Sequence, residues 1–208
     1  MKLLFVHGWG FDRHFWTPLA ALLPQWRHVM DDRGYFGAPC NPSAAGPCIA
    51  VTHSFGTMRV LAAPPLGLRG IVAINGFDRF TALPGRPGVP MRVLDRMLRR
   101  FETDPRGVLG EFRRTCGSAE PFGEIDAPLL QTDLLRLRDA APPLPDVPLL
   151  TLQGGADPLL PPAMRSAVFA GASTADVRRI DHAAGGHLLP IQAPQLCAAA
   201  VRGMAEAA

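Results

Sequence analysis

Short segments rich in apolar residues recur along the chain and predict the strands of a sheet. They cover residues 2–6, 28–31, 48–53, 70–76, 147–153 and 176–180. The longest of them are continuously apolar, which is typical of parallel strands buried on both faces. Segments with helical spacing alternate with them at residues 12–23, 57–63, 164–169 and 194–205. The alternation predicts an α/β protein with a mostly parallel central sheet flanked by helices.

The alternation stops between residues 77 and 144, where three helical segments follow one another. Residues 91–101 predict an amphipathic helix with its large apolar residues on one side and Arg92, Arg96 and Arg99 on another. Two more helices are predicted at residues 108–115 and 129–138. We interpret residues 77–144 as a helical lid inserted over the sheet, within a single domain of residues 1–208.

Composition indicates one globular unit. The chain has 208 residues, 48% of them hydrophobic, which is enough for one sizeable core. The first apolar run is far too short for a signal peptide or a membrane span. The four cysteines form no C-x-x-C pair and no spacing with histidine that is typical of a metal site. We therefore expect a cytoplasmic protein with reduced thiols and no cofactor or metal, and with neither nucleic acid nor a membrane as partner.

The positive charge comes almost entirely from arginine. Lys2 is the only lysine among 21 basic residues, and the formal net charge is +3. Arginine forms planar, bidentate contacts with carboxylates and phosphates, so an acidic partner is one interpretation. A coding bias towards arginine, alanine, glycine and proline is the other, and we favour it as the main cause.

The apolar run that starts at residue 48 ends in Thr52-His53-Ser54-Phe55-Gly56, directly before a segment with helical spacing. A sharp turn from a strand into a helix exposes a serine and aims the first N–H groups of the helix at it. Gly56 stands where such a helix packs closely on a strand. Thr52 occupies the first glycine position of the usual G-x-S-x-G motif, so the motif alone is a weak signal and an ordinary strand with a capping serine would look the same. His53 points elsewhere in a strand of period two and is predicted to be structural.

Two later loops supply the acid and the histidine that a serine nucleophile needs. Asp157 lies in the loop directly after the strand at 147–153, and His187 lies in a glycine-flanked loop after the last strand. The carboxyl ends of parallel strands lie at one edge of a sheet, so Ser54, Asp157 and His187 are predicted to meet there. Serine, acid and histidine also follow the chain order found in α/β-hydrolases.

Both partners have competitors in the sequence. His182 lies in the same loop as His187, but it follows its strand directly, whereas two glycines give His187 the freedom to turn inward. Asp78 also follows a strand, but it stands at the start of the insertion and serves equally well as a helix cap. We favour His187 as the base and Asp157 as the acid.

The loop after the first strand completes the predicted site. Its sequence is His7-Gly8-Trp9-Gly10. A loop at the carboxyl end of this strand presents the N–H of Trp9 beside that of Phe55, and together they predict a two-donor oxyanion hole. A plain glycine turn with a core tryptophan is the alternative.

With these residues in place, the chain resembles the α/β-hydrolase superfamily over nearly its whole length. It lacks the two leading strands of larger members and the helix expected at 38–47, so the resemblance implies a trimmed α/β-hydrolase fold. Within the superfamily it is similar to the pimeloyl-[acyl-carrier protein] methyl ester esterases of biotin synthesis. The shared features are Val6-His7-Gly8-Trp9-Gly10, the Ser54 turn, Ile74-Asn75-Gly76-Phe77-Asp78-Arg79-Phe80, and His187-Leu188-Leu189-Pro190-Ile191 ahead of Pro194.

The resemblance implies a role for each matched residue. Ser54 would be the nucleophile, His187 the base and then the acid, and Asp157 the group that orients the histidine, with Trp9 and Phe55 as oxyanion donors. Substrate contacts are implied for Trp9, Phe77, Phe112 and Cys116. The resemblance also implies a basic lid that docks the acidic acyl carrier protein through Arg92, Arg96, Arg99, Arg100, Arg106, Arg113 and Arg114. A solvated helix face is the alternative interpretation of these arginines.

We therefore expect a serine carboxylesterase that hydrolyses the methyl ester of pimeloyl-acyl carrier protein through an acyl-enzyme. An esterase for small acyl esters, without a carrier partner, would use the same triad. A non-catalytic binding protein of the same fold is the third possibility, and Thr52 is its best support.

Overall fold

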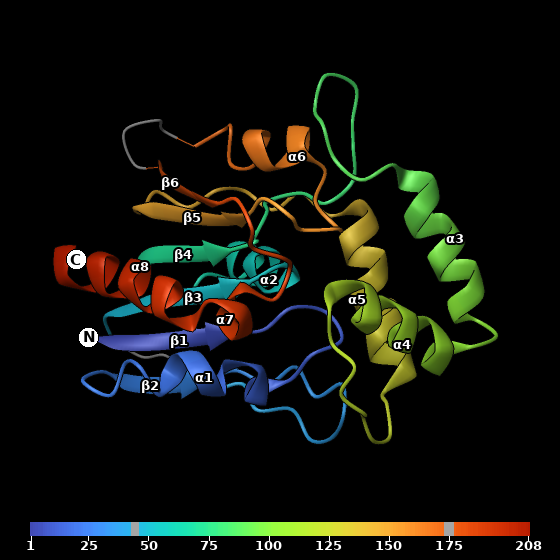
Figure 1. Ribbon diagram of the computed structural model, residues 1–208, viewed down its shortest axis with the longest axis horizontal. Coiled ribbons are helices and arrows are strands. Elements are labelled where there is room, and N and C mark those ends of the chain that lie inside the picture. Colours follow the sequence, from blue (N-terminus) through green and yellow to red (C-terminus); the bar gives the residue numbers. More distant parts are fainter. Residues whose placement is uncertain (43–45, 173–176) are drawn as a thin grey trace.

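The computed structural model describes residues 1–42, 46–172 and 177–208. It contains one sheet of parallel strands in the order β2-β1-β3-β4-β5-β6 (Figure 1). The strands are β1 (Lys2–Val6), β2 (Arg27–Met30), β3 (Cys48–His53), β4 (Leu68–Ile74), β5 (Leu149–Gly154) and β6 (Val177–His182). The predicted α/β architecture with a parallel sheet is confirmed. The predicted start of the last strand at residue 176 lies outside the described residues.

The described helices outside the insertion have eight residues or fewer, apart from α8, which has 14. Outside the insertion they are η1 (Arg13–Trp16), α1 (Thr17–Ala20), α2 (Phe55–Ala62), α6 (Pro162–Ala167), α7 (Leu189–Gln192) and α8 (Pro194–Ala207). The helix predicted at 12–23 is a 3-10 turn followed by α1, because Pro18 has no N–H to continue a regular ladder. In the segment 38–47, residues 43–45 lie outside the described residues and the others contain no helix. The described helices include none that is long and apolar enough to cross a membrane.

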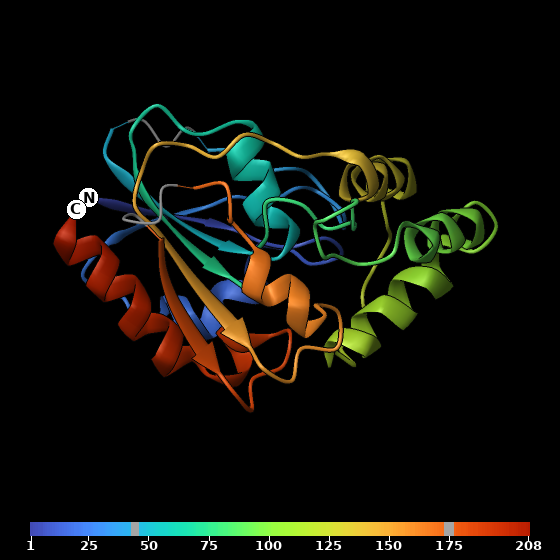
Figure 2. The same ribbon diagram turned by 90° about the horizontal axis from the view of Figure 1, so that it is seen from above.

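Each face of the sheet is covered by its own apolar layer. Leu4 and Val6 of β1 pack into the layer under α2, whereas Leu3 and Phe5 pack into the layer under α1 and α8. Figure 2 shows α2 on one side of the sheet and α1 and α8 on the other. The alternation of faces along a strand of period two explains why β1 reads as a continuous apolar run.

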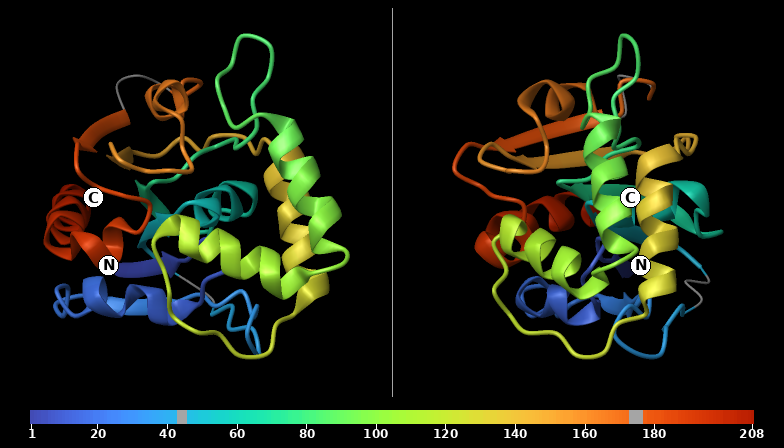
Figure 3. Two further views of the ribbon diagram at one scale, coloured as in Figure 1. Left: turned by 45° about the vertical axis from the view of Figure 1, so that its right-hand side comes forward. Right: turned by 90° about the vertical axis from the view of Figure 1, so that its right-hand side faces the viewer.

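Three helices lie between β4 and β5 and cover the edge at which the strands end (Figures 1 and 3). They are α3 (Met91–Phe101), α4 (Pro105–Cys116) and α5 (Ala127–Asp139). The bounds of α3 agree with the prediction. The other two begin earlier than predicted, because Asp104 and Asp126 cap them by accepting hydrogen bonds from Gly107 N and Leu129 N. Both chain termini lie at the opposite end of the sheet (Figure 1).

Candidate active site

Ser54 occupies a strained turn between β3 and α2. Its φ and ψ are 52° and −126°, a conformation that residues other than glycine rarely adopt and that costs about 1–3 kcal/mol. Its N–H donates to Ile74 O at 3.2 Å, and its carbonyl accepts from Thr57 N at 3.0 Å. A Cβ on Gly56 would lie 2.3 Å from Val6 O, so α2 packs directly on the end of β1. The neighbouring strands and the first turn of the helix together hold the serine in place.

Thr52, which departs from the usual motif, links β3 to α2. It is fully buried, and its Oγ1 lies 2.7 Å from Thr57 Oγ1 and 3.4 Å from Val72 O. A carbonyl only accepts, so Thr52 donates to Val72 and Thr57 donates to Thr52. The turn therefore accommodates this threonine through hydrogen bonds that a glycine would not make.

Asp157 and His187 form a buried pair at the ends of β5 and β6. His187 Nδ1 donates to Asp157 Oδ2 at 2.7 Å, and both side chains are almost completely buried. The other carboxylate oxygen of Asp157 accepts from Leu159 N at 2.7 Å and from Leu160 N at 3.2 Å. These contacts fix the carboxylate and, through it, the plane of the imidazole.

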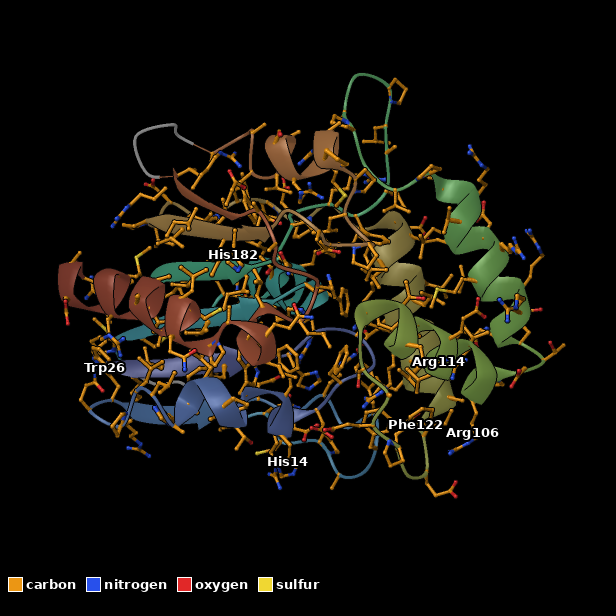
Figure 4. The ribbon with its side chains drawn as sticks, viewed as in Figure 1. His14, Trp26, Arg106, Arg114, Phe122 and His182 are labelled. Carbon is orange, nitrogen blue, oxygen red and sulfur yellow. The ribbon has the colours of Figure 1, made fainter. Side chains whose placement is uncertain are left out.

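Neither competing side chain is hydrogen-bonded to Ser54, Asp157 or His187 within the described residues. Asp78 forms an ion pair with Arg86 and accepts from Phe169 N at 3.1 Å. His182 is the last residue of β6 and lies away from the insertion (Figure 4). The structure therefore pairs Asp157 with His187, as the sequence predicts. Asp78 does not cap any of the described helices.

The remaining ring nitrogen of His187, Nε2, is not engaged by Asp157. Nε2 is buried and has no hydrogen-bond partner among the residues described by the structure. The His187 ring lies 4.8 Å, between centroids, from the ring of His53, the residue before Ser54. No hydrogen bond joins Ser54 Oγ to His187 Nε2 in the described part of the chain. Catalytic hydrogen bonds are often long without substrate and tighten in the complex.

The loop after β1 touches the Ser54 turn. A Cβ on Gly8 would lie 3.1 Å from Ser54 Cβ and 2.9 Å from His53 Nδ1. Phe55 is the first residue of α2, so its N–H has no acceptor within the helix. Trp9 follows Gly8, and its indole Nε1 donates to Leu130 O in α5 at 2.8 Å. The two-donor oxyanion hole stays a prediction.

An apolar cavity of about 320 Å³ extends from Ser54 into the insertion. Trp9, Phe77 and Phe112 line it, in agreement with their predicted positions. Cys116 does not line it, contrary to the expectation. Although it follows Phe112 by one helical turn, Cys116 is buried in the layer under α1 and α8, where burial raises the pKa of its thiol. Within the described residues, no group of three or more metal-ligating side chains is found.

A second cavity, of about 290 Å³, lies between α3 and α4. Four of its lining side chains also line the Ser54 cavity. They are Val93, Met97, Phe112 and Leu159. Arg96 and Arg100 also line this second cavity, and Arg100 forms an exposed ion pair with Glu111 at 2.7 Å. The two cavities therefore adjoin each other at these shared side chains.

Six of the seven arginines predicted for docking are exposed. They are Arg92, Arg96, Arg99, Arg100, Arg106 and Arg114. Arg106 and Arg114 belong to α4 (Figure 4), and the guanidinium of Arg106 lies 5.0 Å from the ring centroid of Phe122 and donates to Gly123 O at 2.7 Å.

Arg113 is the exception, because only 8% of it is exposed. Its Nη1 donates to Gly10 O at 2.8 Å, and its guanidinium lies 4.9–5.7 Å from the ring centroids of Phe11, Phe36 and Phe122. Burial lowers its pKa, and no carboxylate lies within ion-pair distance among the described residues. The docking role predicted for Arg113 is therefore wrong: this side chain holds the loop after β1 rather than facing a partner.

Sequence reasoning missed Asn75, the residue that follows β4. It is fully buried and contacts both the loop that carries Asp157 and the loop that carries His187. The available signal was a polar residue at the end of a continuous apolar strand. His53 does not point elsewhere, as the strand period predicted: its Nε2 donates to His187 O at 2.9 Å, so it contacts the loop that carries the candidate base.

No protein-family model matches the chain, and no curated protein does so either. Solved structures match it along nearly its whole length. An esterase from Exiguobacterium antarcticum matches with a TM-score of 0.81 and 16% identity over 98% of this chain and 91% of its own. A hydrolase from Pseudomonas aeruginosa gives 0.73 and 16% over 98% and 89%. A bromoperoxidase from Bacillus anthracis gives 0.75 and 14% over 99% and 91%.

Identities this low carry information about the fold and not about the reaction. The matches cover 98–99% of this chain, so they include the sheet, the helices on both of its faces and the insertion after β4. The expectation from the sequence is confirmed at this level, and the chain has the α/β-hydrolase fold.

Proposed function

We propose that the protein is a serine carboxylesterase with an apolar acyl pocket. The observation that carries the proposal is Ser54, held at a positive φ at the end of an apolar cavity. Backbone strain of this kind persists only where the surrounding structure enforces it, and it is concentrated at functional sites. The buried pair of Asp157 and His187, with Nε2 unpartnered in the described residues, supports the same conclusion.

In the proposed reaction, Ser54 Oγ attacks the ester carbonyl carbon while His187 Nε2 takes its proton. The N–H groups of Trp9 and Phe55 stabilise the negative charge on the carbonyl oxygen. The bond to the alcohol oxygen then breaks, and the alcohol leaves with the proton from His187. Water attacks the acyl-serine in the same way, giving the carboxylic acid and free Ser54. Asp157 keeps His187 in the required tautomer and stabilises its protonated form.

We further propose the methyl ester of pimeloyl-acyl carrier protein as the substrate. The acyl chain would fill the apolar cavity and reach the surface between α3 and α4. Arg96 lines that route, and further exposed arginines of α3 and α4 surround it, which suits an acidic carrier protein. The sequence resemblance supports this choice of ester.

Covalent labelling tests the nucleophile. Ser54→Ala should abolish labelling by a fluorophosphonate and lower the hydrolysis of a p-nitrophenyl ester by at least about a thousandfold. Ser166→Ala, which removes an exposed serine of α6, should label and turn over like the wild type. Retained turnover in Ser54→Ala would refute the assignment of Ser54 as the nucleophile.

Charge neutralisation tests the carrier. Arg96→Gln with Arg99→Gln should lower kcat/KM for the carrier-bound ester about tenfold at low salt and leave a p-nitrophenyl ester unaffected. The defect should shrink at high salt. The matched control, Arg27→Gln with Arg69→Gln, removes two exposed charges from the opposite edge of the sheet and should have no effect. Equal losses on both substrates would reject docking by the insertion.

Two alternatives are separated by simple experiments. An esterase for small esters would pass the labelling test but fail to restore growth of a biotin-requiring strain that lacks its own esterase. The non-catalytic alternative drew its support from Thr52. Because the hydroxyl of Thr52 is hydrogen-bonded within a strained serine turn, that support is weakened, and labelling of Ser54 would exclude the alternative.

A further inference from the structure

Asn75 is a buried amide at the junction of three strand ends. It directly follows β4, none of its surface is exposed, and its φ is 45°. Asparagine is enriched several-fold among the few residues other than glycine that adopt a positive φ. Asparagine therefore suits the backbone conformation of this position.

All of the polar atoms of the Asn75 amide are used. Nδ2 donates to Gly186 O at 2.9 Å and to His187 O at 2.8 Å, and Oδ1 accepts from Gly154 N at 2.7 Å. Only one orientation of the amide fits, because the two carbonyls only accept and the Gly154 N–H only donates. One side chain thus joins the start of the loop that carries Asp157 to the loop that carries His187.

His53 holds the same carbonyl from the other side. Its Nε2 donates to His187 O at 2.9 Å, so both lone pairs of that oxygen have donors. The His53 ring is fixed in turn by Phe15, whose ring centroid lies 4.5 Å away. The main chain of His187 therefore has little freedom to shift relative to β3 and β4.

The two loops also touch directly. Ala156 N donates to Gly185 O at 2.9 Å, and a Cβ on Gly154 would lie 2.4 Å from the same oxygen. These contacts set the distance between the loops, but they do not fix either loop relative to β4. The Asn75 amide is the contact that does so for both loops at once.

We propose that Asn75 is a positioning residue, which sets the main chain of His187 so that Nδ1 meets Asp157 and Nε2 meets the Ser54 turn. It acts through the backbone and does not touch the substrate. The proposal rests on the serine esterase function proposed above. Because a misplacement of about 1 Å at a catalytic group costs about a hundredfold in rate, loss of this amide should lower kcat by about 10–100-fold. KM should stay within about twofold, since the acyl cavity is lined by other residues.

Two variants separate the side chain from the backbone. Asn75→Gly removes the amide and still allows the positive φ. Asn75→Asp keeps the shape and the acceptor for Gly154 N but places a carboxylate oxygen against two carbonyls. Gln153→Glu is the matched control, because Gln153 is also a buried amide at a strand end, and its Nε2 donates to Gly76 O and Thr151 Oγ1 without contacting the His187 loop.

Three measurements decide the proposal: kcat and KM on a p-nitrophenyl ester, the low-field ¹H NMR signal of the proton between His187 and Asp157, and urea unfolding. We expect both Asn75 variants to lose kcat and to shift or lose the NMR signal. The Gln153 control should keep both at a comparable loss of stability. An unchanged kcat and NMR signal in Asn75→Gly would overturn the proposal, as would a loss of kcat that the control shares.

The design keeps this proposal distinct from the esterase function. If the wild type neither hydrolyses esters nor labels at Ser54, the function fails, and the NMR signal still reports whether Asn75 sets the contact between His187 and Asp157. If Asn75→Asp does not fold, Asn75→Gly carries the test, because it introduces no buried charge.

Discussion

His53 should make the stability of the protein depend on pH. Its ring is completely buried between Phe15 and His187, with centroids 4.5 and 4.8 Å away. Burial, followed by the charge of His187, lowers the pKa of His53 well below its ordinary value of 6.5, although the hydrogen bond to His187 O acts in the opposite direction. The native state therefore keeps this imidazole neutral in mildly acidic solution, whereas the unfolded chain protonates it near pH 6.5.

The direction of this pH dependence follows from the number of protons that each state binds. The unfolded state binds one proton more than the native state below pH 6.5, so the free energy of unfolding decreases as the pH falls. The stabilisation is fully present above the unfolded-state pKa and is lost progressively below it. For an unfolded-state pKa of about 6.5, a change from about pH 7.5 to about pH 5.5 removes about 1.4 kcal/mol.

His53→Gln tests this reasoning, because glutamine does not titrate and keeps an amide donor for His187 O. Urea unfolding, followed by tryptophan fluorescence across the same pH range, gives the free energy of unfolding of each protein. The wild type should lose about 1.4 kcal/mol more than the variant between the two pH values. Replacement of the exposed His14 by glutamine is the control and should leave the pH dependence of the wild type unchanged. Parallel curves for the wild type and His53→Gln would refute the argument.

Two further predictions concern residues next to the site. Thr52→Val leaves the buried Thr57 hydroxyl without its acceptor and should lower the free energy of unfolding by about 1–3 kcal/mol. Addition of Thr57→Val should recover part of that loss in urea unfolding. Strictly additive losses would contradict a hydrogen bond between the two threonines. Arg113→Met removes the donor to Gly10 O and should lower kcat on a p-nitrophenyl ester about tenfold, whereas Met in place of the exposed Arg114 should not. Equal kcat values for the two arginine variants would show that the contact with Gly10 has no influence on the reaction.

The sheet and part of the insertion follow from local signals. β1, β3 and β4 are buried on both faces and therefore appear in the sequence as apolar runs. The helix at 91–101 follows Pro90 and has a clear apolar side, so its bounds could be predicted. The starts of α4 and α5 could not be read from apolar spacing, because Asp104 and Asp126 set them from outside the periodic segments.

Features that depend on contacts between distant segments could not be predicted from the sequence. Ser54, Asp157 and His187 could be predicted because each lies in the turn or loop that follows a strand, and parallel strands end at the same edge. Arg113 resembles its neighbours in the sequence, and its burial depends on aromatic rings from three separate segments. Asn75 finds its partners 79 and 111–112 residues further along the chain, a relation that no local pattern carries.

The insertion holds the loop after β1 at two points, through Arg113 to Gly10 O and through Leu130 O to the indole of Trp9. A chimera that exchanged this insertion for the lid of another hydrolase would therefore alter more than substrate choice. The graft would have to bring a donor for Gly10 and an acceptor for Trp9, or the loop beside Ser54 would lose both anchors. Under the proposed function, a change of the insertion would alter substrate range and catalytic competence together, which would limit how far engineering could change one without the other.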